Sequence, residues 1–503
     1  MAARVGRKWA KCDDCLSERV VVETPQSLRY VPRVHRRHLS LILGLAAGCM
    51  AVATGCNDKP KPAGAASSAT PSAAAPVAVA PSGSAAGGSA ADQPKRPEKM
   101  NVLMLTIDSL RADMPWTGYD KEIAPNLSKL VKESTVYTHA YSTAPYTAQS
   151  VASWLSGRYA STLYRQGWFF TGYSKANHFF PEALQDAGIR TIGWQAHLYF
   201  GRGKGLDQGF DVWEMAPGIV FDPNTDRDIT SDKMEALGKE LLGKSENTGK
   251  QFFAWAHFMD PHDQYNKHPG VPDFGNNNRG RYDNEVYFTD EHIGSLLSWA
   301  EKQPWWKNTA LIITGDHGEA FGDHDMWKHA FEVWEVLLRV PLIIKVPGAK
   351  PQRIEERRSL IDLAPTIMDL MGQKPLDSFM GQSLVPEVVG EKKPEKRDVI
   401  VAELAEDSHN PPRRTVIKGD YKLIVFGTGW KYLLYDIKND PHEDKDLAKE
   451  QPEKLEEMKK VLADAFAKIP SVEPYGGMKL KGGKVANGPM GPPAEKKPAE
   501  DKK

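Results

Sequence analysis

The residue with the clearest potential for ester chemistry is Thr147, whose hydroxyl lies at the start of a predicted helix. Thr147 follows Pro145 and precedes a stretch in which apolar residues recur at helical spacing as far as Gly157. This pattern predicts a helix with Thr147 at its N-cap and Gly157 at its end. A hydroxyl at a helix N-terminus faces free backbone N–H groups and the positive end of the helix dipole, which suits an anionic ester. Taken alone, Thr147 would be a helix cap, the ordinary use of threonine at such a position.

Three further polar residues follow predicted buried strands. Asp108 comes directly after the apolar run 102–107, and Asp316 and His317 follow the apolar run 310–314. Such runs are typical of parallel strands covered on both faces, and the carboxyl ends of these strands converge on one ligand crevice. Two carboxylates and an imidazole suit one divalent metal ion, Mn, Zn or Ca. Each residue alone would be a turn or cap residue, but their coincidence favours a metal site.

The elements that must position these residues alternate between strands and helices. This pattern predicts an α/β fold with a mostly parallel central sheet and helices on both faces, plus a smaller C-terminal α+β subdomain. We expect strands at 102–107, 190–195, 252–257, 310–314 and 340–346, and shorter ones within 399–403 and 421–435. We expect helices near 125–131, 180–187, 228–242, 283–302, 362–371 and 452–467.

Composition divides the chain of 503 residues into five predicted segments. These are a signal peptide with a lipidation box (1–56), a disordered linker (57–98), a catalytic domain (99–390), a C-terminal subdomain (391–475) and a disordered tail (476–503). The 65 basic residues balance the 65 acidic ones, so we expect no nucleic-acid partner. The glycine-rich loop 201–209 lacks the spacing of a nucleotide fingerprint, so we expect no organic cofactor.

All four cysteines lie in the first 56 residues. A basic stretch precedes the apolar run 39–55, which ends at Cys56 in the pattern of a bacterial lipoprotein box, and Cys49 ends a competing box. We therefore predict a lipid-anchored protein of the cell envelope, periplasmic or on the outer surface. An uncleaved N-terminal anchor is the alternative. Cys12 and Cys15 have no second Cys or His pair nearby, which argues against a zinc site.

Successive motifs of the chain resemble those of the sulfatase family, a member of the alkaline phosphatase superfamily. The resemblance covers roughly residues 99–470 and rests on segments 101–113, 144–158, 257–262, 315–324 and 363–366, in the family's order. It implies a metal-dependent enzyme that cleaves sulfate or phosphate esters. By position, the metal ligands would be Asp108, Thr147, Asp316 and His317. Thr147 would be the nucleophile, and His262 and Lys328 would contact the ester oxygens or the leaving group.

The chain departs from the main sulfatases at two places. Those enzymes oxidise a Cys or Ser to formylglycine within a Cys-x-Pro-Ser-Arg motif, whereas this chain has Thr147-Ala148-Gln149-Ser150-Val151. They also carry paired aspartates after the first strand, where this chain has Asp108-Ser109. Because an oxidised threonine would be a ketone, we expect Thr147 to act unmodified, as in the threonine-dependent phosphodiesterases and transferases of the superfamily.

Three functions follow from this resemblance. The first is a hydrolase of sulfate or phosphate (di)esters on a small molecule, a glycan or a lipid, with Thr147 as the nucleophile. The second is a transferase that passes a phospho-head-group to envelope lipids or glycans, although such transferases usually have several membrane spans and this chain has one apolar segment. The third is a non-catalytic binding lipoprotein that retains the fold.

Overall fold

Residues 99–219, 230–476, 478–479 and 485–486 are described by a computed structural model, and all of them belong to the unit Gly87–Lys503. The predicted signal peptide, the lipidation at Cys56 or Cys49 and the linker lie outside the described residues, as does most of the predicted tail, so these stay predictions. Within the described ranges, no helix combines the length and the apolar character that crossing a bilayer requires.

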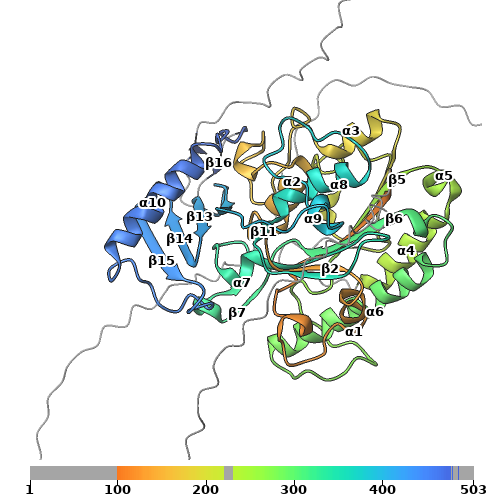
Figure 1. The fold of residues 1–503 in the computed structure, drawn as a ribbon, viewed down its shortest axis with the longest axis horizontal. Coiled ribbons are helices and arrows are strands. Elements are labelled where there is room, and N and C mark those ends of the chain that lie inside the picture. Colours follow the sequence, from red (N-terminus) through yellow and green to blue (C-terminus); the bar gives the residue numbers. More distant parts are fainter. Residues whose placement is uncertain (1–98, 220–229, 477, 480–484, 487–503) are drawn as a thin grey trace, which may run out of the picture. The chain divides into compact units, whose positions relative to one another are not determined.

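A central, mostly parallel sheet organises the fold (Figure 1). In the described part of the chain it has nine strands in the order β10-β2-β9-β6-β1-β5-β3-β4, with β11 paired to β2. β1 pairs in parallel with both β5 and β6, whereas β9 runs antiparallel to β2 and β6. The strands are β1 (Asn101–Ile107), β2 (Thr135–Tyr141), β3 (Arg190–Gln195), β4 (Val212–Met215), β5 (Phe252–Phe258), β6 (Thr309–Gly315), β9 (Arg339–Lys345), β10 (Gln352–Ile354) and β11 (Arg358–Ser359). The predicted α/β architecture is confirmed.

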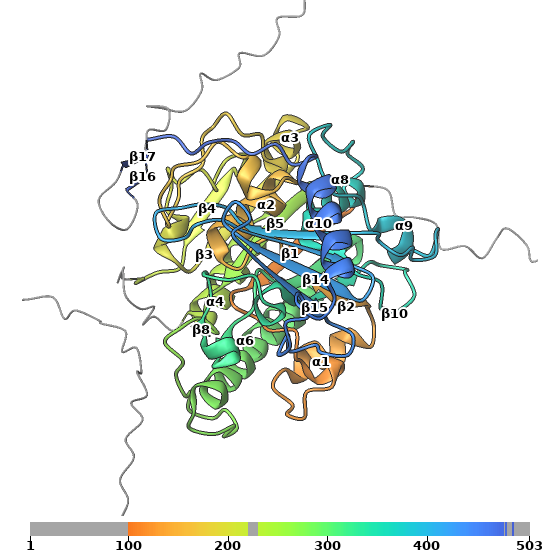
Figure 2. The same ribbon diagram turned by 90° about the vertical axis from the view of Figure 1, so that its left-hand side faces the viewer.

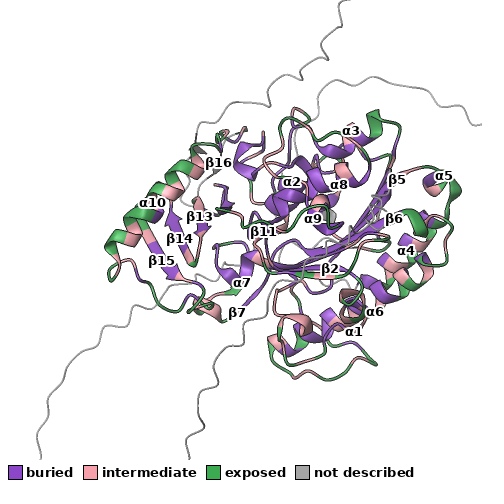
Figure 3. Ribbon diagram, viewed as in Figure 1, coloured by how far each residue is buried: buried purple, intermediate pink, exposed green. Residues whose placement is uncertain are grey.

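Helices cover both faces of this sheet (Figures 1 and 3). On β1, Val102 and Met104 join one buried cluster with residues of α2 and α8, while Leu103 and Leu105 join the opposite cluster with residues of α4 and α6. Alternate side chains of a strand point to opposite faces, so a strand between two helical layers is apolar throughout. The helices are α1 (Pro125–Val131), α2 (Thr147–Ser156), α3 (Phe180–Asp186), α4 (Ser231–Gly243), α5 (Ser245–Thr248), α6 (Asn278–Ala300), α7 (Glu335–Leu338), α8 (Leu363–Leu370) and α9 (Val385–Val388).

A second sheet follows near the C-terminus, as predicted. Its four strands form an antiparallel meander, and α10 (Pro452–Phe466) packs against β13 and β14, crossing in front of the strands in Figure 2. The strands are β12 (Ile400–Leu404), β13 (Arg413–Lys418), β14 (Tyr421–Phe426) and β15 (Lys431–Asp436). Two short hairpins complete the described elements: β7 (Ala320–Phe321) with β8 (Trp327–Lys328), and β16 (Met478–Lys479) with β17 (Val485–Ala486).

A buried ion cluster joins the C-terminal sheet to α7. The side chain of Lys422, on β14, is fully buried, and its Nζ lies 3.1 Å from Glu335 Oε1 and 2.8 Å from Glu443 Oε1. Removing one member of a buried ion cluster leaves uncompensated charge in a medium of low dielectric. Lys422→Ala is therefore expected to lower the free energy of unfolding by about 3–5 kcal/mol, measured by denaturant titration.

The matched control is Lys418→Ala, in the neighbouring strand β13. The Lys418 side chain is partly exposed, and its Nζ lies 3.8 Å from Asp398. Exposed pairs of this kind contribute within about 1 kcal/mol. Equal destabilisation by the two substitutions would contradict the structural role of the buried cluster.

Candidate active site

Asp108, Asp316 and His317 meet at the carboxyl ends of β1 and β6. These strands pair in parallel with Ile107 opposite Gly315, so the residues that follow them emerge side by side. All three residues are fully buried. One candidate ligand atom from each lies within 4.8 Å of the other two. The structure thus brings together the three metal ligands that the sequence proposed at separate strand ends.

Thr147 is the first residue of α2. With Thr147 as the N-cap, the helix would have begun at Ala148. Tyr146, with extended backbone angles, occupies the cap position, so the predicted N-cap was wrong by one residue. Thr147 Oγ1 lies 3.0 Å from Asp108 Oδ2 and 3.1 Å from His317 Nε2. The predicted end of the helix at Gly157 is confirmed, because this residue adopts a left-handed conformation with φ of 63°.

The donor atoms of this cluster fit one divalent cation. His317 Nδ1 lies 2.9 Å from the carbonyl oxygen of Gly318, so the Nδ1 proton is donated there and Nε2 keeps its lone pair. Asp316 Oδ2 is buried and accepts no hydrogen bond from any described residue. Four kinds of potential ligand atom therefore lie close together: carboxylate oxygens of Asp108 and Asp316, Nε2 of His317 and the hydroxyl oxygen of Thr147. Such a set suits Mn, Zn or Ca.

Burial and mutual proximity shift the pKa values of these groups. Burial, and then the Asp108 charge, raise the pKa of Asp316 to about 7. Burial also acts to raise the pKa of Asp108, but neighbouring histidines, His262 first, outweigh it and hold this pKa well below its usual range. Burial, followed by the His329 charge, lowers the pKa of His317 to about 3. The imidazole of His317 is therefore neutral at physiological pH, as a metal ligand must be.

Two buried neighbours hold Asp108 in place. His257 Nε2 lies 3.1 Å from Asp108 Oδ2, and its Nδ1 lies 2.7 Å from Thr106 Oγ1. Ser109 Oγ donates to Asp108 Oδ1 at 2.7 Å, and its backbone N–H donates to Asp316 Oδ1 at 3.2 Å. Ser109 stands where the main sulfatases have their second aspartate, and it donates a hydrogen bond to each of the carboxylates of Asp108 and Asp316. Partners of this kind orient metal ligands and tune their basicity.

Thr147 and Asp108 line a cavity of about 280 Å³, and His262, Lys328 and His329 line it too. Lys328, on β8, pairs with Asp263 at 2.5 Å between Nζ and Oδ2. His329 Nδ1 lies 3.1 Å from Glu319 Oε1. Burial acts to lower the pKa of His329, but Glu319 outweighs it and raises this pKa to about 9. His329 is thus protonated at physiological pH and lines the same cavity as Thr147.

Several cavity residues were not among the predicted ones. Phe169, Phe170 and Phe331 line the cavity but lie in loops, where no periodic pattern marks them. His197 also lines it, and burial followed by the His262 charge lowers its pKa to about 4. His197 carried a usable signal, because it follows the end of β3 as Asp108 follows β1. No pattern in the sequence indicated that His329 pairs with Glu319.

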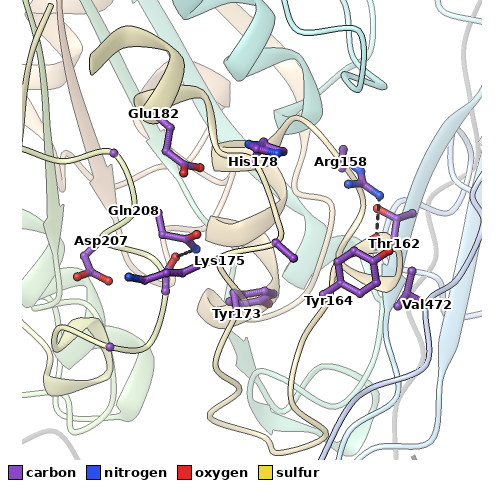
Figure 4. A pocket seen from close by; sticks show the side chains of 14 residues that line it. Arg158, Thr162, Tyr164, Tyr173, Lys175, His178, Glu182, Asp207, Gln208 and Val472 are labelled. Atoms are coloured by element: carbon purple, nitrogen blue, oxygen red, sulfur yellow. Dashed lines mark hydrogen bonds between the residues drawn. The ribbon is translucent and has the colours of Figure 1, made fainter. Parts of the chain in front are cut away.

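A larger cavity, of about 830 Å³, lies apart from these residues (Figure 4). It is lined by polar side chains such as Arg158, Lys175 and Glu182, and the glycine-rich loop 201–209 contributes to it. It shares no lining residue with the smaller cavity. Tyr173 links the two, since it lines the larger cavity while its Oη donates to the carbonyl oxygen of Ala148 in the smaller one. The chemistry-bearing residues thus occupy the smaller cavity.

The chain is similar to known proteins in both sequence and fold. The sulfatase family model matches residues 100–373, more than half of the chain, and the model of the N-sulphoglucosamine sulphohydrolase C-terminal region matches residues 322–470. An ulvan-active sulfatase from Formosa agariphila is 24% identical over 358 residues, which are 62% of this chain. The matched part spans 58% of that relative's length.

Two further similarities extend the comparison. A choline-sulfatase from Rhizobium meliloti is 24% identical over 429 residues, which cover 70% of this chain and 82% of that protein. Among solved structures, a phosphonate monoester hydrolase from Silicibacter pomeroyi superposes with a TM-score of 0.61 at 20% identity. That superposition covers 74% of this chain and 96% of the other, and it shows that the two share a fold.

Proposed function

The chain belongs to the sulfatase family, and on this premise we propose that it is a metal-dependent hydrolase of sulfate or phosphate esters with Thr147 as its nucleophile. One observation carries the proposal. Thr147 Oγ1 stands at the first turn of α2 within hydrogen-bond distance of Asp108 Oδ2 and His317 Nε2, in the cavity that His262 and Lys328 line. A hydroxyl held among acceptors at a helix N-terminus is placed to attack an anionic ester.

The reaction follows from what each side chain can do. Thr147 Oγ1 attacks the sulfur or phosphorus atom as its proton passes to Asp108 Oδ2, to which it is hydrogen-bonded, and as the bond to the leaving oxygen breaks. That oxygen takes a proton from His262 or Lys328. Water then attacks the same sulfur or phosphorus atom and gives a proton to the group that had protonated the leaving oxygen. The bond to Thr147 Oγ1 breaks, Oγ1 takes its proton back from Asp108, and inorganic sulfate or phosphate leaves. A divalent cation held by Asp108, Asp316 and His317 would lower the pKa of the hydroxyl and offset charge that develops on the ester.

Cationic and dipolar groups stabilise the charge of the ester. His329 is protonated, and since Nδ1 faces Glu319, its second ring N–H is left to contact an ester oxygen. Backbone N–H groups in the first turn of α2 have no partner within the helix and add to this stabilisation. These groups act where charge builds up, so they favour the transition state over the bound ester.

The experiment that tests the proposal compares sulfate and phosphate esters of one alcohol. The full chain, supplied with Mn, Zn or Ca, is expected to release inorganic sulfate or phosphate from at least one ester, measured as the free ion over time. Turnover only in the presence of an added acceptor alcohol would instead indicate a transferase. Ester binding without any turnover would indicate a binding protein and would overturn the proposal.

A further inference from the structure

Aromatic rings form one wall of the active-site cavity. Tyr146, which directly precedes the nucleophile, stacks on Phe169 with ring centroids 5.0 Å apart and planes 5° from parallel. The ring of Phe331 lies 6.4 Å from that of Phe169, with planes 14° from parallel, and Phe170 meets Phe169 edge-on at 5.1 Å. The rings of Tyr146 and Phe331 thus both lie nearly parallel to that of Phe169. We call Tyr146, Phe169, Phe170 and Phe331 the aromatic wall.

The segment that follows β12 holds the aromatic wall in position. Tyr146 Oη donates to Asp407 Oδ2 at 3.1 Å, and the backbone N–H of Phe169 donates to Ser408 Oγ at 3.1 Å. The imidazole of His409 packs edge-on against Phe169, with ring centroids 5.3 Å apart. These contacts fix the ring planes before any ligand arrives, which lowers the entropic cost of stacking on them.

Exposed aromatic surface gathers at this cavity. Phe170 is 40% exposed and Phe331 is 47% exposed, although burial of such side chains is favourable. Five large hydrophobic side chains are exposed in the described part of the chain, and four of them lie in the segments 168–170 and 327–331, each of which contributes residues to the cavity lining. Exposed apolar surface that is concentrated in this way marks a binding site.

Charged groups on the cavity lining limit what this wall can bind. Apart from the metal cluster and the histidines, the charged lining groups are Lys328 and Asp263, which pair with each other, and Lys328 is also one of the two proposed proton donors to the leaving oxygen. His197, with a pKa of about 4, is neutral at physiological pH. A polyanionic glycan therefore meets no unpaired lysine or arginine in this lining. A quaternary ammonium group meets no unpaired carboxylate outside the metal cluster and would be held by the ring faces alone. A single neutral sugar can stack the C–H face of its ring on this wall, but the hydroxyls around that ring need hydrogen-bond partners that the aromatic carbons do not offer.

We propose that the leaving group is an uncharged alcohol with a broad apolar face, which stacks on the aromatic wall. This inference rests on the proposed function, since it names the part of the ester that departs from Thr147. Phe331 and Phe170 are its specificity-determining residues, because they are the two rings of the wall that are exposed in the cavity lining.

Two measurements test this proposal. Isothermal titration of the full chain with 2-naphthol, glucose and choline measures binding without turnover, and 2-naphthol is expected to bind at least about tenfold more tightly than the other two. Steady-state kinetics with the 2-naphthyl ester are expected to show KM raised about tenfold by Phe331→Ala, with kcat changed less than about threefold. The matched control is Trp430→Ala. Trp430 is 68% exposed, lies in the turn between β14 and β15, and is not part of the cavity lining.

The outcomes separate this inference from the proposed function. Tighter binding of glucose or choline than of 2-naphthol would overturn the inference, as would an unchanged KM in Phe331→Ala. An equal rise of KM in Trp430→Ala would also overturn it. A chain that binds 2-naphthol through Phe331 but hydrolyses no ester would instead contradict the proposed function and leave the aromatic wall as a binding surface.

Discussion

Thr147→Ala is expected to lower kcat/KM for ester hydrolysis by about 10⁴-fold, because the substitution removes the attacking oxygen. The side chain is small and half-buried, and its hydroxyl has Asp108 and His317 as hydrogen-bond partners among the described residues, so the fold is expected to persist. Initial rates with the preferred ester measure the effect. The melting temperature, expected to stay near that of the parent chain, separates a catalytic loss from unfolding.

Thr147→Ser is the informative control. It keeps the hydroxyl at the first turn of α2, so turnover is expected to fall by no more than about 10- to 100-fold. If Thr147→Ala retained turnover close to that of the parent chain, the nucleophile would have to be sought elsewhere.

Asp316→Asn is expected to remove the bound divalent metal and to lower turnover by about 10³-fold. The amide keeps the size of the side chain and an acceptor for Ser109 N–H, but it removes the negative charge that opposes the cation. Metal content after dialysis, measured by elemental mass spectrometry, is compared with the ester turnover of the same sample. A chelator is expected to produce the same loss in the parent chain, and added Mn, Zn or Ca is expected to reverse it.

Asp263→Asn is the matched control for this effect. Asp263 lines the same cavity but pairs with Lys328 and is not part of the Asp108–Asp316–His317 cluster. Its replacement is therefore expected to leave the metal content unchanged. Full metal occupancy in Asp316→Asn, or equal metal loss in both variants, would contradict the metal site.

The sequence could predict the sheet and the cluster for one physical reason. A strand buried on both faces is apolar along its length, so the first polar residue after it marks the end of the strand, as Asp108 does after β1 and Asp316 after β6. Parallel pairing of β1 with β6 then places such residues side by side. The position of Thr147 was predicted less well, since helix boundaries from sequence are uncertain by a residue or more.

Other features carried no readable pattern. β2 mixes Thr, Tyr and His with small residues, and β13 mixes Arg and Lys with apolar ones, so neither strand was predicted. Their strand conformation is set by pairing with β9 and with β12 and β14. The aromatic wall depends on loops from distant parts of the chain that meet only after folding.

Mass spectrometry of the peptide that contains Thr147 tests the central claim most directly. The full chain is mixed with metal and a hydrolysed ester, quenched in acid during turnover and digested. We predict a peptide that carries one sulfuryl or phosphoryl group on Thr147, and no such group in the Thr147→Ala variant. An unmodified Thr147 during demonstrated turnover, or the group attached to another residue, would contradict the assignment of Thr147 as the nucleophile.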